Sequence, residues 1–108
     1  MSQFVKAATT DQIQPGKCLG VKVEGVFIGI YNVKGEYYAM NNICPHLGGV
    51  LSYGFLDNNC VTCPLHMWEF DVTTGECVWP GEEKLPTYAV KVEGEDILVD
   101  VETPLQAS

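Results

Sequence analysis

Positive charge is scarce in this chain, and long apolar runs are missing. The 108 residues include 6 Lys+Arg against 14 Asp+Glu, which gives a formal net charge of -8. Nucleic acids and anionic membranes require a basic binding surface, so this balance argues against both as partners, whereas a basic protein partner is compatible with it. No stretch of about 20 apolar residues occurs, so we expect no transmembrane helix.

The amino terminus also lacks a targeting signal. Residues 1–8 show no basic start followed by an apolar run of about 7–15 residues, so we expect no signal peptide and a cytoplasmic location. The chain has 5 cysteines, and an odd number fits a reducing compartment better than a disulfide framework. These cysteines are therefore candidates for metal ligands, small buried side chains or nucleophiles.

Helical periodicity of 3.6 residues is absent as well, apart from one possible short turn at 11–14. Runs of about 4–8 residues alternate instead with turns that contain Gly, Asn or Asp, which is typical of strands. The runs that we predict as strands are 17–24, 26–33, 36–43, 60–63, 68–72, 76–79, 88–92 and 97–101. With roughly nine or ten strands in one domain of this length, the fold class is all-β, a sandwich or small barrel.

The chain has only 2 histidines, and each closely follows a cysteine. Cys44 precedes His46 and Cys63 precedes His66, so the pattern is C-x-H, then residues 47–62, then C-x-x-H. Two Cys and two His suit either zinc or an iron–sulfur centre. Zinc fingers usually pair Cys with Cys and His with His, whereas here each short loop supplies one of each. That arrangement favours a centre with two different irons, as in the Rieske 2Fe–2S cluster, where two His replace two Cys on one iron.

The two loops, at 44–49 and 63–68, resemble the cluster loops of Rieske proteins. From 4 to 102 the chain is similar to the Rieske-type ferredoxins of bacterial ring-hydroxylating oxygenase systems, which serve aromatic hydrocarbon catabolism. We call residues 44–49 the first cluster loop and residues 63–68 the second cluster loop. The resemblance implies one Rieske domain over 1–108, an antiparallel β-sandwich with a small cluster-binding subdomain at about 43–80.

The resemblance also implies one 2Fe–2S cluster and a ligand set for it. Cys44 and Cys63 would hold the inner iron, and His46 and His66 the outer iron near the tip of the protein. Short turns that contain Gly48, Gly49 and Gly54 would let backbone N–H groups approach the sulfides.

The chain departs from the respiratory Rieske proteins at four positions. Gly49 and Leu65 stand where those proteins carry two further cysteines, so their loop-to-loop disulfide cannot form. Trp68 and Phe70 stand where those proteins carry a Ser and a Tyr that bond toward the cluster sulfurs. Loss of such hydrogen bonds lowers the reduction potential, so we expect a value in the lower part of the Rieske range.

The function implied is electron transfer, without catalysis by the chain itself. A monomeric ferredoxin would carry single electrons from a flavin-containing NAD(P)H reductase to a terminal oxygenase. The first alternative is the small Rieske-like subunit of an assimilatory nitrite reductase, which would accompany a sirohaem subunit. The second is a zinc-binding interaction module, which would be colourless and hold one zinc.

Three cysteines lie outside the implied ligand set. Cys60 forms C-x-x-C with Cys63 and is a rival ligand, but we interpret it as a small strand residue, and Cys18 and Cys77 as structural. The apolar residues beside the ligands should form a collar that limits water around the cluster and serves as a docking patch. These residues are Pro45, Leu47, Pro64, Leu65 and Met67.

Overall fold

The computed structural model describes residues 4–43, 49–64, 67–79 and 84–102. In these residues the chain forms ten strands and two short 3-10 helices. The strands are β1 (Val5–Thr9), β2 (Cys18–Val23), β3 (Val26–Val33), β4 (Glu36–Asn41), β5 (Phe55–Asp57), β6 (Cys60–Thr62), β7 (Glu69–Asp71), β8 (Cys77–Trp79), β9 (Thr87–Glu93) and β10 (Asp96–Asp100). The 3-10 helices are η1 (Thr10–Gln12) and η2 (Leu51–Tyr53). The all-β prediction is confirmed.

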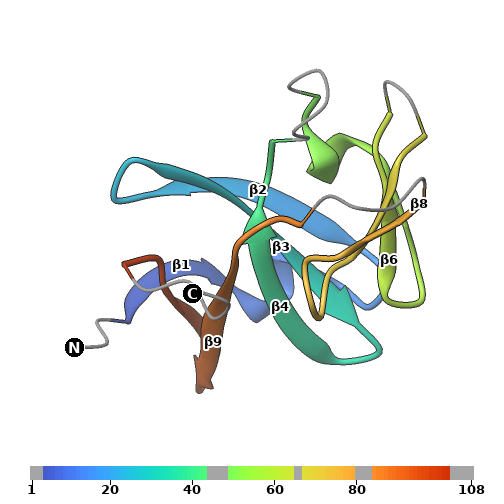
Figure 1. Ribbon diagram of the computed structural model, residues 1–108. Helices are drawn as coiled ribbons and strands as arrows, with labels where there is room; N and C mark the ends of the chain where they lie inside the picture. The colour runs from blue at the N-terminus through green and yellow to red at the C-terminus, as the bar shows by residue number, and fades with distance from the viewer. Residues whose placement is uncertain (1–3, 44–48, 65–66, 80–83, 103–108) are drawn as a thin grey trace.

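The strands form two antiparallel sheets (Figure 1). The main sheet has six strands in the order β1-β10-β9-β4-β3-β2, and its edge strands β1 and β2 also contact each other, so it curls nearly closed. The small sheet has four strands in the order β5-β6-β7-β8. In Figure 1 the small sheet lies on the right, beside the main sheet.

Tight turns set the register of the main sheet. Glu24 and Gly25 both have positive φ between β2 and β3, as do Lys34 and Gly35 between β3 and β4. Two successive residues of this kind make the two-residue turn whose twist matches that of the flanking strands. The three long strands β2, β3 and β4 therefore pair in register along their length.

Two apolar clusters hold the sheets together. The first is aliphatic and fills the curl of the main sheet, with Ile13, Ile28, Ile30, Ile97 and Val99 at its centre. The second lies between the main and small sheets and is richer in aromatic and sulfur-containing side chains. Its buried members are Tyr31, Met40, Leu51, Val61, Cys63, Phe70, Val72, Cys77 and Leu85.

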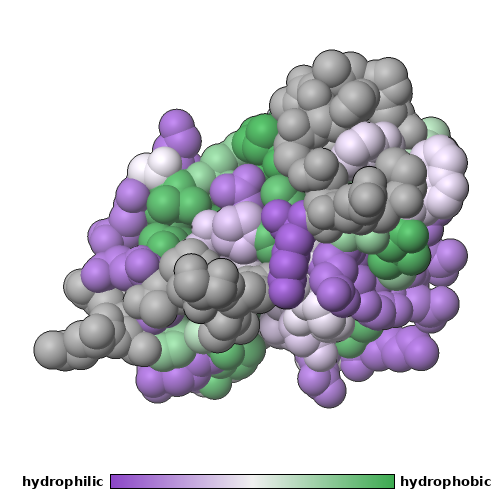
Figure 2. Space-filling model, viewed as in Figure 1, coloured by the Kyte–Doolittle hydropathy of each residue, from purple (hydrophilic) through white to green (hydrophobic). Residues whose placement is uncertain are grey.

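The predicted strands agree with eight of those observed, and the differences are local. β1 and β5 were not expected, because β1 pairs only with the distant β10 and β5, with the sequence Phe-Leu-Asp, shows no alternation of apolar and polar residues. The run expected at 36–43 ends as a strand at Asn41, after which Ile43 makes an isolated bridge to Val50. Figure 2 shows hydrophilic residues spread widely over the visible face, in keeping with the excess of acidic residues.

Candidate metal centre

The structure describes one of the four predicted ligands. Cys63 is 1% exposed and follows β6 directly. Cys44, His46 and His66 lie outside the described residues. The described segments on either side of these positions show how the bases of the two cluster loops are built.

The base of the first cluster loop is closed by backbone pairing. Ile43 and Val50 form an antiparallel bridge, so the chain leaves and returns at the same place. The Leu51 N–H then donates to the Asn42 carbonyl at 2.9 Å, and η2 begins there. The two ends of the first cluster loop are thus joined beside the end of β4.

The base of the second cluster loop is closed by two backbone hydrogen bonds. The Cys63 N–H donates to the Trp68 carbonyl at 2.7 Å, and the Met67 N–H donates to the Cys63 carbonyl at 3.0 Å. Met67 has a φ of 60°, in the left-handed region, which turns the chain back toward β7. Pro64 and Met67 are exposed, as expected for an apolar collar, whereas Pro45, Leu47 and Leu65 lie outside the described residues.

The two loop bases touch each other at Gly54. A Cβ atom on Gly54 would overlap the carbonyl of Thr62, the residue before Cys63. The Gly54 N–H already donates to the Leu51 carbonyl at 2.9 Å. The missing side chain of Gly54 therefore allows close packing of the two backbones. Gly48 lies outside the described residues.

An apolar layer lies beneath Cys63. Cys63 belongs to the buried cluster that contains Tyr31, Leu51 and Phe70, and Trp68 packs against the same cluster. The Trp68 and Phe70 rings lie 6.4 Å apart between centroids. This side of the site is therefore dry, a condition that affects the potential of a metal cluster held above it.

Among the described residues, Cys18, Cys60 and Cys77 are also free thiols. The Cys18 thiol donates to the Ser52 carbonyl (3.4 Å) and the Cys77 thiol to the Trp79 carbonyl (3.3 Å). Burial raises the pKa of Cys18, although Lys17 opposes the effect. These positions support the structural interpretation of Cys18 and Cys77.

Cys60 is a half-buried residue of a strand. It lies in β6 and pairs with Asp57 on β5 and Asp71 on β7. Burial and the nearby carboxylates of Asp71, Glu69 and Asp57 raise the pKa of its thiol. Within the described segments no group of three or more His, Cys, Asp or Glu side chains is arranged to hold a metal ion.

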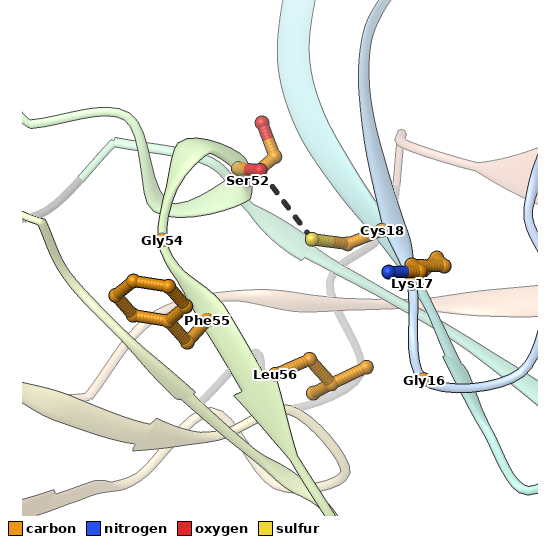
Figure 3. A pocket seen from close by; sticks show the side chains of 7 residues that line it. All are labelled: Gly16, Lys17, Cys18, Ser52, Gly54, Phe55 and Leu56. Atoms are coloured by element: carbon orange, nitrogen blue, oxygen red, sulfur yellow. Dashed lines mark hydrogen bonds between the residues drawn. The ribbon is translucent and has the colours of Figure 1, made fainter.

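A groove of about 310 Å³ lies behind the loop bases, between the start of β2 and the η2–β5 segment (Figure 3). Cys18 and Ser52 meet across it, and Phe55 and Leu56 form its other wall. Cys63 does not line this groove, although Cys18 and Leu56, which do, pack against the buried cluster that contains Cys63.

Comparison with known proteins identifies the family. The family model described as Rieske [2Fe-2S] domain matches residues 3–89. The chain belongs to the Rieske [2Fe-2S] domain family. The cofactor of this family is the Rieske 2Fe–2S cluster, and the donor set fits it, because the two loops together offer two thiols and two imidazoles and the described thiol is buried above a dry layer.

Two curated relatives match this chain over at least nine-tenths of their own length. The ferredoxin component of the naphthalene 1,2-dioxygenase system of Pseudomonas aeruginosa is 39% identical over 92% of this chain and 96% of its own. The biphenyl dioxygenase ferredoxin subunit of Pseudomonas sp. (strain KKS102) is 40% identical over 90% of this chain and 91% of its own.

Solved structures show the same Rieske fold. The ferredoxin of carbazole 1,9a-dioxygenase from Nocardioides aromaticivorans IC177 superposes with a TM-score of 0.86 at 33% identity, covering 92% of this chain and 98% of its own. A chain from the complex of reduced oxygenase and oxidized ferredoxin in carbazole 1,9a-dioxygenase gives 0.88 at 29%, covering 98% and 100%. A candidate nitrite reductase small subunit from Mycobacterium tuberculosis gives 0.86 at 22%, covering 95% and 98%, which shows a shared fold alone.

Proposed function

We propose that this chain is the ferredoxin of a multicomponent ring-hydroxylating dioxygenase system. It accepts single electrons from a flavin-containing NAD(P)H reductase and passes them to the terminal oxygenase, without binding or converting the substrate itself. The observation that carries the proposal is the match at 39% and 40% identity, over nine-tenths of the chain, to proteins named as dioxygenase ferredoxins. An oxygenase–ferredoxin complex among the similar structures supports the oxygenase as a partner.

We propose further that Cys44 and Cys63 hold the inner iron and that His46 and His66 hold the outer iron. When bound, the cluster supplies one-electron redox chemistry. The burial of Cys63, with Pro64 and Met67 exposed beside it, supports an inner thiolate side and an outer side near the surface. The small sheet and the two loops, at about 43–80, would form the cluster-binding subdomain.

The reduction potential is expected to lie in the lower part of the Rieske range of about -150 to +300 mV. Trp68 and Phe70 stand where a Ser and a Tyr would donate to the sulfurs, and neither side chain carries a hydroxyl group. The Phe70 ring is fully buried in the apolar layer. A redox titration measures this directly, and a midpoint near the upper end would contradict the proposal.

We also propose that the protein is a monomer in the cytoplasm, where NAD(P)H is available to the reductase. The free state of Cys18, Cys60, Cys63 and Cys77 is compatible with a reducing compartment. Cell fractionation and size-exclusion chromatography test these two points.

Reconstitution tests the function. Anaerobically purified protein should contain about two irons and two acid-labile sulfides per chain, and the reduced form should be paramagnetic. With a matching reductase and oxygenase, NAD(P)H-driven substrate oxidation should depend on this chain. A colourless protein with one zinc would establish the interaction module instead, and activity only with a sirohaem nitrite reductase would establish the other alternative.

A further inference from the structure

Asn42 lies at the base of the first cluster loop and is fully buried. Its backbone N–H donates to the Phe27 carbonyl on β3 at 3.1 Å, and its carbonyl accepts from the Leu51 N–H at 2.9 Å. Its side-chain Oδ1 accepts from the Ser52 N–H at 2.8 Å, and its Nδ2 donates to the Ser52 Oγ at 2.9 Å. One residue therefore joins the main sheet to the segment that follows the loop.

The space for this contact comes from Gly20 on β2. A Cβ atom on Gly20 would lie 2.6 Å from the Asn42 Nδ2 and 2.7 Å from the Ser52 Oγ. Real Cβ atoms do not approach other heavy atoms so closely. Gly20 is not among the residues with positive φ, so the glycine serves the contact and not the backbone conformation.

The same contact reaches the second cluster loop. Leu51, which bonds to Asn42, is fully buried in the cluster that contains Cys63. Three residues farther on, Gly54 packs against the carbonyl of Thr62. The main sheet, Asn42, η2 and the start of the second loop are thus in continuous contact.

We propose that Asn42 is a positioning residue for the 2Fe–2S cluster, which sets where the first ligand loop stands relative to the second. The inference rests on the ligand set proposed above, and Asn42 acts through its hydrogen bonds to Leu51 and Ser52, which follow the first cluster loop. Residues that orient metal ligands from outside typically change metal affinity about 10–100-fold when they are replaced.

A second buried asparagine provides a matched control. The Asn32 Nδ2 donates to the Ile13 carbonyl and its Oδ1 accepts from the Gly35 N–H, both at 2.8 Å. Asn42→Ala and Asn32→Ala each remove two side-chain hydrogen bonds at a buried site, so both should lower stability. Only the Asn42 bonds lie at a cluster loop.

The experiment follows the holoprotein by three measurements. These are the rate of cluster loss to an iron chelator, the EPR spectrum of the reduced form and the reduction potential. Asn42→Ala should lose its cluster about 10–100-fold faster, with a shifted EPR spectrum and potential. Asn32→Ala should resemble the wild type in all three once the folded fraction is matched.

Two milder variants keep the test decisive if Asn42→Ala does not fold. Ser52→Ala removes only the Oγ partner. Gly20→Ala keeps both the Asn42 and the Ser52 side chain but displaces them from the β2 side. Both should change the EPR spectrum and the rate of cluster loss in the same direction as Asn42→Ala, by smaller amounts. Wild-type behaviour in the folded variants, or equal effects in Asn32→Ala, would overturn the proposal. A wild-type protein without a 2Fe–2S cluster would instead refute the proposed function.

Discussion

The main sheet encloses an apolar core made by its own strands, whereas the small sheet packs against residues of the main sheet. Strands of the main sheet have 5 to 8 residues and enclose an aliphatic core. The four strands of the small sheet have 3 residues each, at the lower limit of strand length. Their inner row, Leu56, Val61, Phe70 and Cys77, packs on Tyr31 and Met40, which belong to the main sheet.

The difference shows that the region proposed to bind the cluster is supported from outside. A sheet of such short strands cannot bury enough apolar surface alone, because its other face is open to solvent at Phe55 and Trp79. Its order therefore depends on the main sheet beneath it and, when the metal is bound, on ligand bonds that add to folding stability. Mutations should separate the support given by the main sheet from the support given by the ligand bonds.

The largest expected effect is that of Cys63→Ser. The variant loses a proposed ligand, so we expect loss of the visible chromophore and most of the iron. Relative to the wild type, amide exchange should accelerate more in β5–β8 than in β2–β4. Iron analysis and hydrogen exchange measure these changes. The control is Cys77→Ser, a buried cysteine of the same apolar cluster, which should keep its iron. Full iron content in Cys63→Ser would contradict the ligand assignment.

Gly54→Ala tests the contact between the loop bases. The added methyl group collides with a backbone carbonyl that cannot rotate away, so we expect a loss of about 1–3 kcal/mol in urea unfolding. Gly25→Ala is the contrast, because its Cβ meets no neighbouring atom and only the φ of +84° opposes it. That substitution should cost about 1–2 kcal/mol in the main-sheet hairpin and leave cluster retention unchanged. If Gly54→Ala and Gly25→Ala lose the cluster equally, the contact at Gly54 has no special role in cluster retention.

Met67→Glu tests whether the exposed collar is a docking surface. Met67 is 55% exposed beside the second cluster loop, and Val92, at 45%, is exposed on the main sheet. A charge at Met67 should slow electron transfer to the oxygenase several-fold by desolvation at the contact, without bleaching the cluster. Stopped-flow reoxidation of the reduced protein measures this. If Val92→Glu slows transfer equally, the effect comes from net charge and not from the collar.

The smallest expected effect concerns the thiol of Cys60. Its raised pKa favours the protonated form in the folded state, so its contribution to stability is present at neutral pH and is lost as pH rises through the folded-state pKa. Alkylation of this residue, followed by peptide mapping, should therefore reach half its maximal rate at a higher pH than in unfolded protein. Asp57→Asn, which removes a carboxylate opposite Cys60, should lower that pH. No change would leave burial and the carboxylates of Asp71 and Glu69 as the causes.

The sequence predicted most of the main sheet because its signals are local. Glu24-Gly25 and Lys34-Gly35 mark the turns, and the apolar runs between them are long enough to be read directly. β1 and β5 were missed because no local sequence pattern marks either segment as a strand that pairs with β10 or β6.

The ligand pattern was also visible in the sequence, since the only two histidines each follow a cysteine. Neither the role of Asn42 nor that of Gly20 could be predicted, because their contact joins β2, the end of β4 and η2. The close packing of Gly54 against Thr62 has the same origin, because only the fold brings these two residues together.

Strands β1 and β10 pair with each other on the left of Figure 1, in the main sheet, whereas the small sheet lies on the right. A peptide tether joined ahead of the first strand or behind the last would therefore start away from the end of the molecule where we propose that the cluster binds. Immobilisation on an electrode through such a tether, or fusion to a redox enzyme, should leave that end free to meet other molecules.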